Sequence, residues 1–156
     1  MKNSAFKYLY LSLILIFLSG CGFKPIGSQN NYKITEIETS GEKKINYILK
    51  NKLITNNNNN NQKIELKINT RKDKSIKEKN IKNEIVKYTI KVTSDVTSNF
   101  IDKNEINNFN ITVSGSFDVA ENYSQTINNE KNLINQLSNE ISNEINRKLL
   151  FKINDL

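Results

Sequence analysis

The sequence predicts an α+β fold, a two-layer sandwich in which two helices pack on one face of a four-stranded, mostly antiparallel sheet. Two stretches, residues 85–96 and 109–119, alternate apolar and polar side chains with a period of two, as strands with one buried and one wet face do. Two other stretches, residues 41–53 and the C-terminal segment, carry apolar residues at helical spacing. The resulting order, β-α-β-β-β-α, lets both helices cover the same face.

The first three elements lie between residues 32 and 70. Residues 32–39 (YKITEIET) are expected to form the first strand, and residues 41–53 (GEKKINYILKNKL) the first helix. The asparagine run at 56–61 is expected to end that helix as a solvated loop. Residues 63–70 (KIELKINT) alternate apolar side chains with charged or amide ones, so they are expected to form the second strand.

The two long strands and a C-terminal helix complete the order. The strands are IVKYTIKVTSDV and FNITVSGSFDV, and the sequence DKNEIN from Asp102 suits the hairpin turn between them. The final helix could be capped by Ser124 or Thr126. Its apolar stripe consists of Ile127, Ile134, Leu137, Ile141, Ile145 and Leu149.

Residues 1–20 are predicted to be a signal peptide. Lys2 and Lys7 flank the start of an uncharged apolar run, residues 8–18. A membrane-spanning helix needs about 20 apolar residues, so this run is too short to be one.

The end of this segment predicts a lipid anchor. The sequence LSGC, ending at Cys21, resembles the bacterial lipobox, in which the cysteine thiol is acylated and becomes the first residue of the mature chain. Cys21 is the single cysteine, so it has no disulfide partner within the chain. Residues 21–31 are expected to be a tether, and residues 32–156 the folded domain. In such lipoproteins an Asp after the cysteine means inner-membrane retention. Gly22 stands there, which implies the periplasmic face of the outer membrane.

The composition argues against an enzyme. The chain has no histidine, and the one thiol is expected to be acylated, so the commonest general base, metal ligand and activated nucleophile are missing. No glycine-rich phosphate loop is present. We therefore expect no catalytic residues, no metal and no cofactor.

One cluster of basic residues remains as a candidate binding site. Residues 63–91 contain ten basic and four acidic residues, in a chain whose net charge is +7. A hairpin places this charge at its tip and along its wet face, where it could hold phosphate or carboxylate groups. The alternative is a solvated lysine-rich hairpin with no ligand. Nucleic acid is a poor candidate, since a secreted, lipid-anchored chain does not meet it. The candidate residues are Arg71, Lys74, Lys77, Lys79 and Lys82.

Taken together, these features resemble the LPS-assembly lipoprotein LptE family. The resemblance begins with CGFKP at Cys21, continues through the β-α-β order, and is strongest at NEIVKYTIKVTSDV and ITVSGSFDVAENYS, which look like the family's two long central strands. It ends with INRKLL in the terminal helix. The conjunction of these features, rather than any single motif, carries the resemblance.

The resemblance implies a function. LptE-like proteins insert as a plug into the LptD β-barrel, help that barrel fold, and bind lipopolysaccharide (LPS) on its way to the outer leaflet. The expected partners are therefore LptD, LPS and the membrane. The alternative is a small outer-membrane lipoprotein that serves as an adaptor in another lipid-transport or envelope complex. It would be stable without a barrel and show no preference for LPS.

Overall fold

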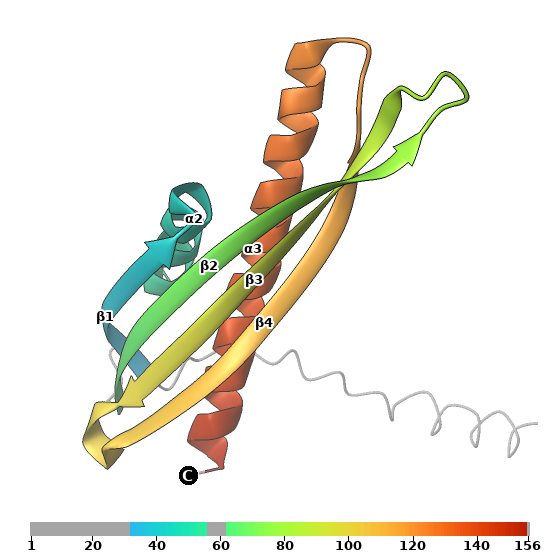
Figure 1. Ribbon diagram of the computed structural model, residues 1–156. Helices are drawn as coiled ribbons and strands as arrows, with labels where there is room; N and C mark the ends of the chain where they lie inside the picture. The colour runs from blue at the N-terminus through green and yellow to red at the C-terminus, as the bar shows by residue number, and fades with distance from the viewer. Residues whose placement is uncertain (1–31, 56–61, 156) are drawn as a thin grey trace, which may run out of the picture.

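The predicted fold class and element order are confirmed by the computed structural model, which describes residues 32–55 and 62–155 (Figure 1). The predicted signal peptide, Cys21, the tether and the asparagine run lie outside the described residues. The elements are β1 (Tyr32–Gly41), α2 (Lys43–Thr55), β2 (Gln62–Lys79), β3 (Ile85–Phe100), the short 3-10 helix η1 (Ile101–Lys103), β4 (Glu105–Asp118) and α3 (Tyr123–Asn154).

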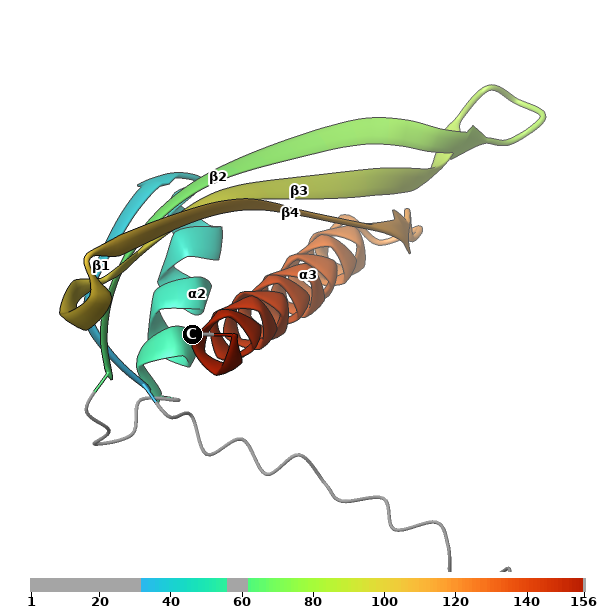
Figure 2. The ribbon, with the colours of Figure 1, turned by 90° about the horizontal axis from the view of Figure 1, so that it is seen from below.

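The four strands form one sheet in the order β1-β2-β3-β4. β1 runs parallel to β2, and the other two pairs are antiparallel. Both helices lie on the same side of this sheet, which leaves the opposite face without a helical layer (Figure 2). We call the face toward the helices the inner face and the other the outer face.

The core fills the space between the inner face and the two helices. Because side chains of a strand alternate between faces, every second residue is buried there over residues 64–70 of β2 and 90–100 of β3. On β3 the buried set runs from Ile90 to Phe100, and on α3 it includes Ile141, Ile145 and Leu149, each with no exposed area. Two buried serines, Ser94 and Ser142, have hydroxyl oxygens with no hydrogen-bond partner among the described residues.

A buried polar network fixes the corner between β1 and α2. The Asn46 amide donates to the Ser40 carbonyl (2.9 Å) and its oxygen accepts from the Thr70 hydroxyl (2.8 Å). The Glu42 amide donates to the Thr70 hydroxyl (3.0 Å). Gly41 lies against the same residue with φ of +91°, a conformation that L side chains rarely adopt. The chain can therefore turn here only with glycine.

Four details differ from the sequence-based expectations. The turn expected over DKNEIN from Asp102 is shorter, because β4 already begins at Glu105, which pairs with Phe100. β2 continues nine residues beyond the predicted end at Thr70, because residues 71–79 keep pairing with β3. The start of α3 is capped by Asn122, whose side-chain oxygen accepts from the Ser124 amide (2.8 Å), instead of by Ser124 or Thr126. Ile127 is 47% exposed, so the buried stripe of α3 begins nearly two turns later, at Leu133.

Candidate functional site

The paired strands β2 and β3 extend past the rest of the sheet at their turn, and we call residues 76–86 the distal hairpin. β4 ends at Asp118, which is paired with Lys87, so the hairpin beyond this pair has no third strand. Figure 2 shows its tip projecting past the end of β4. The start of β1 lies at the opposite end of the sheet, since Tyr32 pairs with Gln62 and the Lys63 amide donates to Asp102 beside the β3–β4 turn (2.9 Å).

The hairpin tip is built by Asn80. Its backbone amide donates to the Glu84 carbonyl (2.9 Å), and its side-chain oxygen accepts from the amides of Lys82 (2.9 Å) and Glu84 (3.0 Å). Asn83 adopts a φ of 62°, a left-handed conformation that asparagine tolerates better than most residues. The backbone of the tip thus has a defined conformation.

Three of the five candidate basic residues gather on this hairpin. Lys77 donates to the Ser116 hydroxyl (3.0 Å) and Lys79 to the Asn83 side-chain oxygen (3.0 Å). The Lys82 side chain is exposed at the turn. Within the described part of the chain, none of these three ammonium groups forms an ion pair. Their positive charge is therefore available to an anion.

The other two candidates are already paired with carboxylates. The Arg71 guanidinium contacts Asp95 (2.9 Å) on the outer face. The Lys74 ammonium contacts Glu130 of α3 (2.6 Å), and it lies 4.4 Å from the centroid of the Tyr88 ring, so its side chain lies on the inner face. The structure therefore separates Arg71 and Lys74 from each other and from the three lysines of the tip.

Two exposed isoleucines accompany the lysines, and the sequence reasoning did not single them out. Ile81, at the turn, is fully exposed, and Ile76 is 50% exposed. An isoleucine between Asn80 and Lys82, in a polar turn, was the signal that could have identified the first of them. The distal hairpin also carries Glu78 and Glu84, so its three lysines leave a small positive charge beside the exposed isoleucines, a combination that suits an anionic amphiphile.

The outer face forms a second candidate surface. Every outward side chain of β3 from Thr89 to Asn99, and of β4 from Asn108 to Ser116, is polar. These side chains bond to one another across strands. The pairs are Thr89 with Ser116 (3.1 Å), Thr93 with Thr112 (3.3 Å), Asp95 with Asn110 (2.6 Å), Thr97 with Asn108 (2.7 Å) and Asn99 with Glu65 (3.0 Å). The face is a broad hydrogen-bonding surface without an apolar patch.

Charged pairs border this surface. Lys87 contacts Asp118 (3.2 Å), and that contact raises the pKa of Lys87 above its ordinary value. Lys67 contacts Glu38 (2.9 Å) at the other side of the sheet, with the same effect on the pKa of Lys67. No cluster of metal-ligating side chains is present among residues 32–55 and 62–155, and none of the helices described there is long and apolar enough to cross a membrane.

This arrangement, a mixed four-stranded sheet with both helices on one face, is the fold of small bacterial lipoproteins. The structure is similar to rare lipoprotein B from Shewanella oneidensis, with a TM-score of 0.58 at 11% identity, covering 77% of this chain and 97% of that one. It is also similar to lipoprotein B from Nitrosomonas europaea (TM-score 0.55, 10% identity, 78% and 86% covered) and to a minor lipoprotein from Acinetobacter baumannii (0.50, 14%, 74% and 93%). No family model and no curated protein matches the chain.

Proposed function

We propose that this protein is an LptE-like lipoprotein that is anchored through Cys21 at the periplasmic face of the outer membrane. In this proposal it has no enzymatic activity. It occupies the lumen of the LptD β-barrel as a plug, assists the folding of that barrel, and binds LPS for delivery to the outer leaflet. The similarity in fold to small bacterial lipoproteins supports the proposal at the level of architecture.

The observation that carries the proposal is the uncovered polar outer face. Two-layer domains keep a sheet face that is open to water polar, and here that face is lined mainly with threonine, serine and asparagine along β3 and β4. The lumen of an outer-membrane barrel is polar, so a plug must offer it hydrogen-bonding side chains in place of apolar ones. The outer face offers such side chains along two long strands, and they are held in place by their cross-strand bonds.

The distal hairpin supplies a binding site for LPS. The lipid A portion of LPS carries both phosphate groups and acyl chains, which match the free ammonium groups and the exposed isoleucines of the tip. β3 has 16 residues and therefore spans about 50 Å, more than the ~30 Å hydrocarbon core of a bilayer. A domain whose Tyr32 end faces the inner leaflet would thus place this tip at the level of the outer leaflet.

Exchanging the three free lysines for glutamate tests the LPS site. The triple variant Lys77→Glu, Lys79→Glu, Lys82→Glu is expected to weaken LPS binding about tenfold or more, because three attractive contacts become repulsive. Binding is measured with the full-length protein in detergent. The matched control changes the exposed lysines Lys43, Lys44 and Lys50 of α2 in the same way and should retain binding. Equal losses in both variants would show a general charge effect and remove the hairpin from the proposal.

A further inference from the structure

The edge of the sheet at β4 has free backbone hydrogen-bonding groups. The Val119 amide donates to the Val86 carbonyl (2.9 Å), and bonded pairs alternate along an antiparallel ladder, so odd-numbered residues of β4 bond to β3. The even-numbered residues from Ile106 to Ser116 then direct their amides and carbonyls away from the sheet. The next carbonyl in this row, that of Asp118, accepts from the Asn129 side chain (3.0 Å). The others have no partner within the described residues.

This edge lacks the features by which proteins usually prevent pairing. β4 pairs with β3 over 14 residues without a bulge, and it has no charged side chain between Glu105 and Asp118 and no proline. The opposite edge, β1, differs in both respects: it has a register shift between Ile34 and Glu36, and it carries several charged side chains. Only β4, of the two described edges, is a regular template for another strand.

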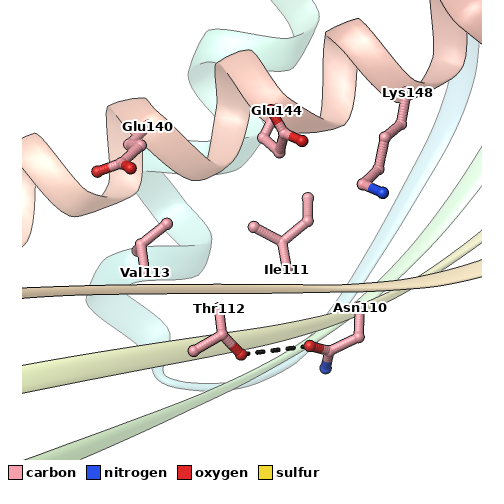
Figure 3. Close-up of a pocket in the computed structure, with 7 residues that line it drawn as sticks. All are labelled: Asn110, Ile111, Thr112, Val113, Glu140, Glu144 and Lys148. Atoms are coloured by element: carbon pink, nitrogen blue, oxygen red, sulfur yellow. Dashed lines mark hydrogen bonds between the residues drawn. The ribbon is translucent and has the colours of Figure 1, made fainter.

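A groove between β4 and α3 lies beside the free edge. It consists of two cavities, about 320 and 510 Å³, that share Lys148. Ile111 and Val113 of β4 point into the smaller cavity toward Glu140, Glu144 and Lys148 of α3 (Figure 3). The larger cavity is lined by Phe109, Phe151 and the basic end of α3. A strand added to β4 would direct every second side chain into this groove.

Three charged side chains of the groove form no ion pair among the described residues: Glu140, Lys148 and, at the C-terminal end of α3, Asp155. The Glu144 carboxylate is bound by Arg147, which lowers the pKa of Glu144, and Lys152 pairs with Glu105 (2.7 Å). Glu140 has no ion pair within residues 32–55 and 62–155. The Lys148 ammonium lies over the Phe109 ring, 5.5 Å from its centroid, and its charge also acts on the Glu144 carboxylate without an ion-pair contact. Eight helical residues separate Glu140 from Lys148, about 12 Å along the helix axis. Four residues of a strand cover about the same distance, ~14 Å.

We propose that β4 and this groove bind an extended segment of a partner polypeptide by strand addition. The segment carries a basic and an acidic residue four positions apart on the same face, with an apolar residue between them. Because α3 runs antiparallel to β4, an antiparallel segment presents the basic residue to Glu140 first and the acidic residue to Lys148 afterwards. The free amides of β4 require the bound segment to be extended. Glu140 and Lys148 determine where the charged residues of that segment lie.

Two other occupants fit less well. A second copy of this chain would add its own β4, which has no charged side chain between its ends to meet Lys148 or Glu140. A closed barrel has no free strand edge. A barrel protein could therefore supply the added strand only from a segment that is not one of its wall strands. The inference therefore does not depend on the proposed function, and either can fail alone.

A synthetic peptide tests the proposal on the full-length protein in detergent micelles. The sequence Thr-Val-Thr-Lys-Thr-Val-Thr-Glu-Thr-Val-Thr places the two charges and the valines on one face. In the control peptide, Thr-Val-Lys-Thr-Thr-Val-Glu-Thr-Thr-Val-Thr, the composition is unchanged but both charges lie on the opposite face. Affinity is measured by fluorescence anisotropy, and amide hydrogen exchange by NMR.

The first peptide is expected to slow exchange at the free amides of Asn108, Asn110, Thr112 and Ser114. The control peptide should bind about tenfold more weakly. The variant Lys148→Glu should lose affinity to a similar degree and regain it with a peptide whose Glu is replaced by Lys. The proposal is overturned by equal affinity of the two peptides, by binding without slowed exchange at these amides, or by no binding up to about 1 mM. Concentration-dependent protection without peptide would show a second copy as the occupant, and would also overturn it.

Discussion

Replacing Gly41 by alanine is expected to destabilise the domain by about 3 kcal/mol or more. An added Cβ at this position would lie 1.9 Å from the Thr70 carbonyl oxygen, a backbone atom held in the β1–β2 ladder. The positive φ adds strain that alanine does not relieve. Thermal unfolding followed by circular dichroism should show a melting temperature lower by roughly 10 °C or more, or no cooperative transition.

Gly115 provides the matched control. A Cβ there would lie 2.6 Å from the Cδ1 atom of Leu133, which is the end of a side chain that can change rotamer. The same substitution should therefore cost only about 1 kcal/mol. If Gly41→Ala and Gly115→Ala have equal melting temperatures, the described turn between β1 and α2 is wrong.

The second large effect is expected from Phe100→Ala. Phe100 is among the largest fully buried side chains, at the end of β3 where it pairs with Ile64 and Glu105. Removing its ring should leave a cavity and cost about 3–5 kcal/mol, a large part of the 5–15 kcal/mol that stabilises a typical domain. Urea unfolding of the full-length protein in detergent should give a correspondingly lower midpoint.

The control for this variant is the same substitution of phenylalanine by alanine at an exposed position. Phe151 is 66% exposed on the last turns of α3, so Phe151→Ala should change the free energy of unfolding by less than about 0.5 kcal/mol. A large loss from Phe151→Ala, or a small one from Phe100→Ala, would contradict the position of the core.

The parts of the fold that bury one face were predictable from sequence. The strand alternation of β3 and β4 and the stripe of α3 reflect burial directly, so their type and order follow from the positions of isoleucine, leucine and valine. The extension of β2 was not predictable in this way. Beyond Thr70, Lys72 is half-buried and the residues from Asp73 to Lys79 are exposed, so no burial pattern exists. The strand continues there through backbone pairing with β3 and through side-chain contacts such as that of Lys74 with Glu130.

The candidate site was predictable only as a concentration of charge. Which cations are free depends on partners distant in the sequence: Glu130 for Lys74, and Asp95 for Arg71. The free edge of β4 was likewise not predictable from sequence, because every residue has the same backbone groups. They are unpaired here only because β4 is the last strand in the sheet order. The outer face was partly predictable, because the polar residues at alternate positions of each strand indicated a side that points away from the core.

The measurement that tests the central claim most directly is an affinity pull-down of the C-terminally tagged full-length protein from detergent-solubilised native membranes, followed by mass spectrometry. The plug proposal predicts a large outer-membrane β-barrel in near-stoichiometric amount that stays bound through high salt, because the polar outer face would make many hydrogen bonds to the lumen. Recovery of a transport ATPase complex, or of no partner at all, would contradict it and favour an adaptor in another envelope complex.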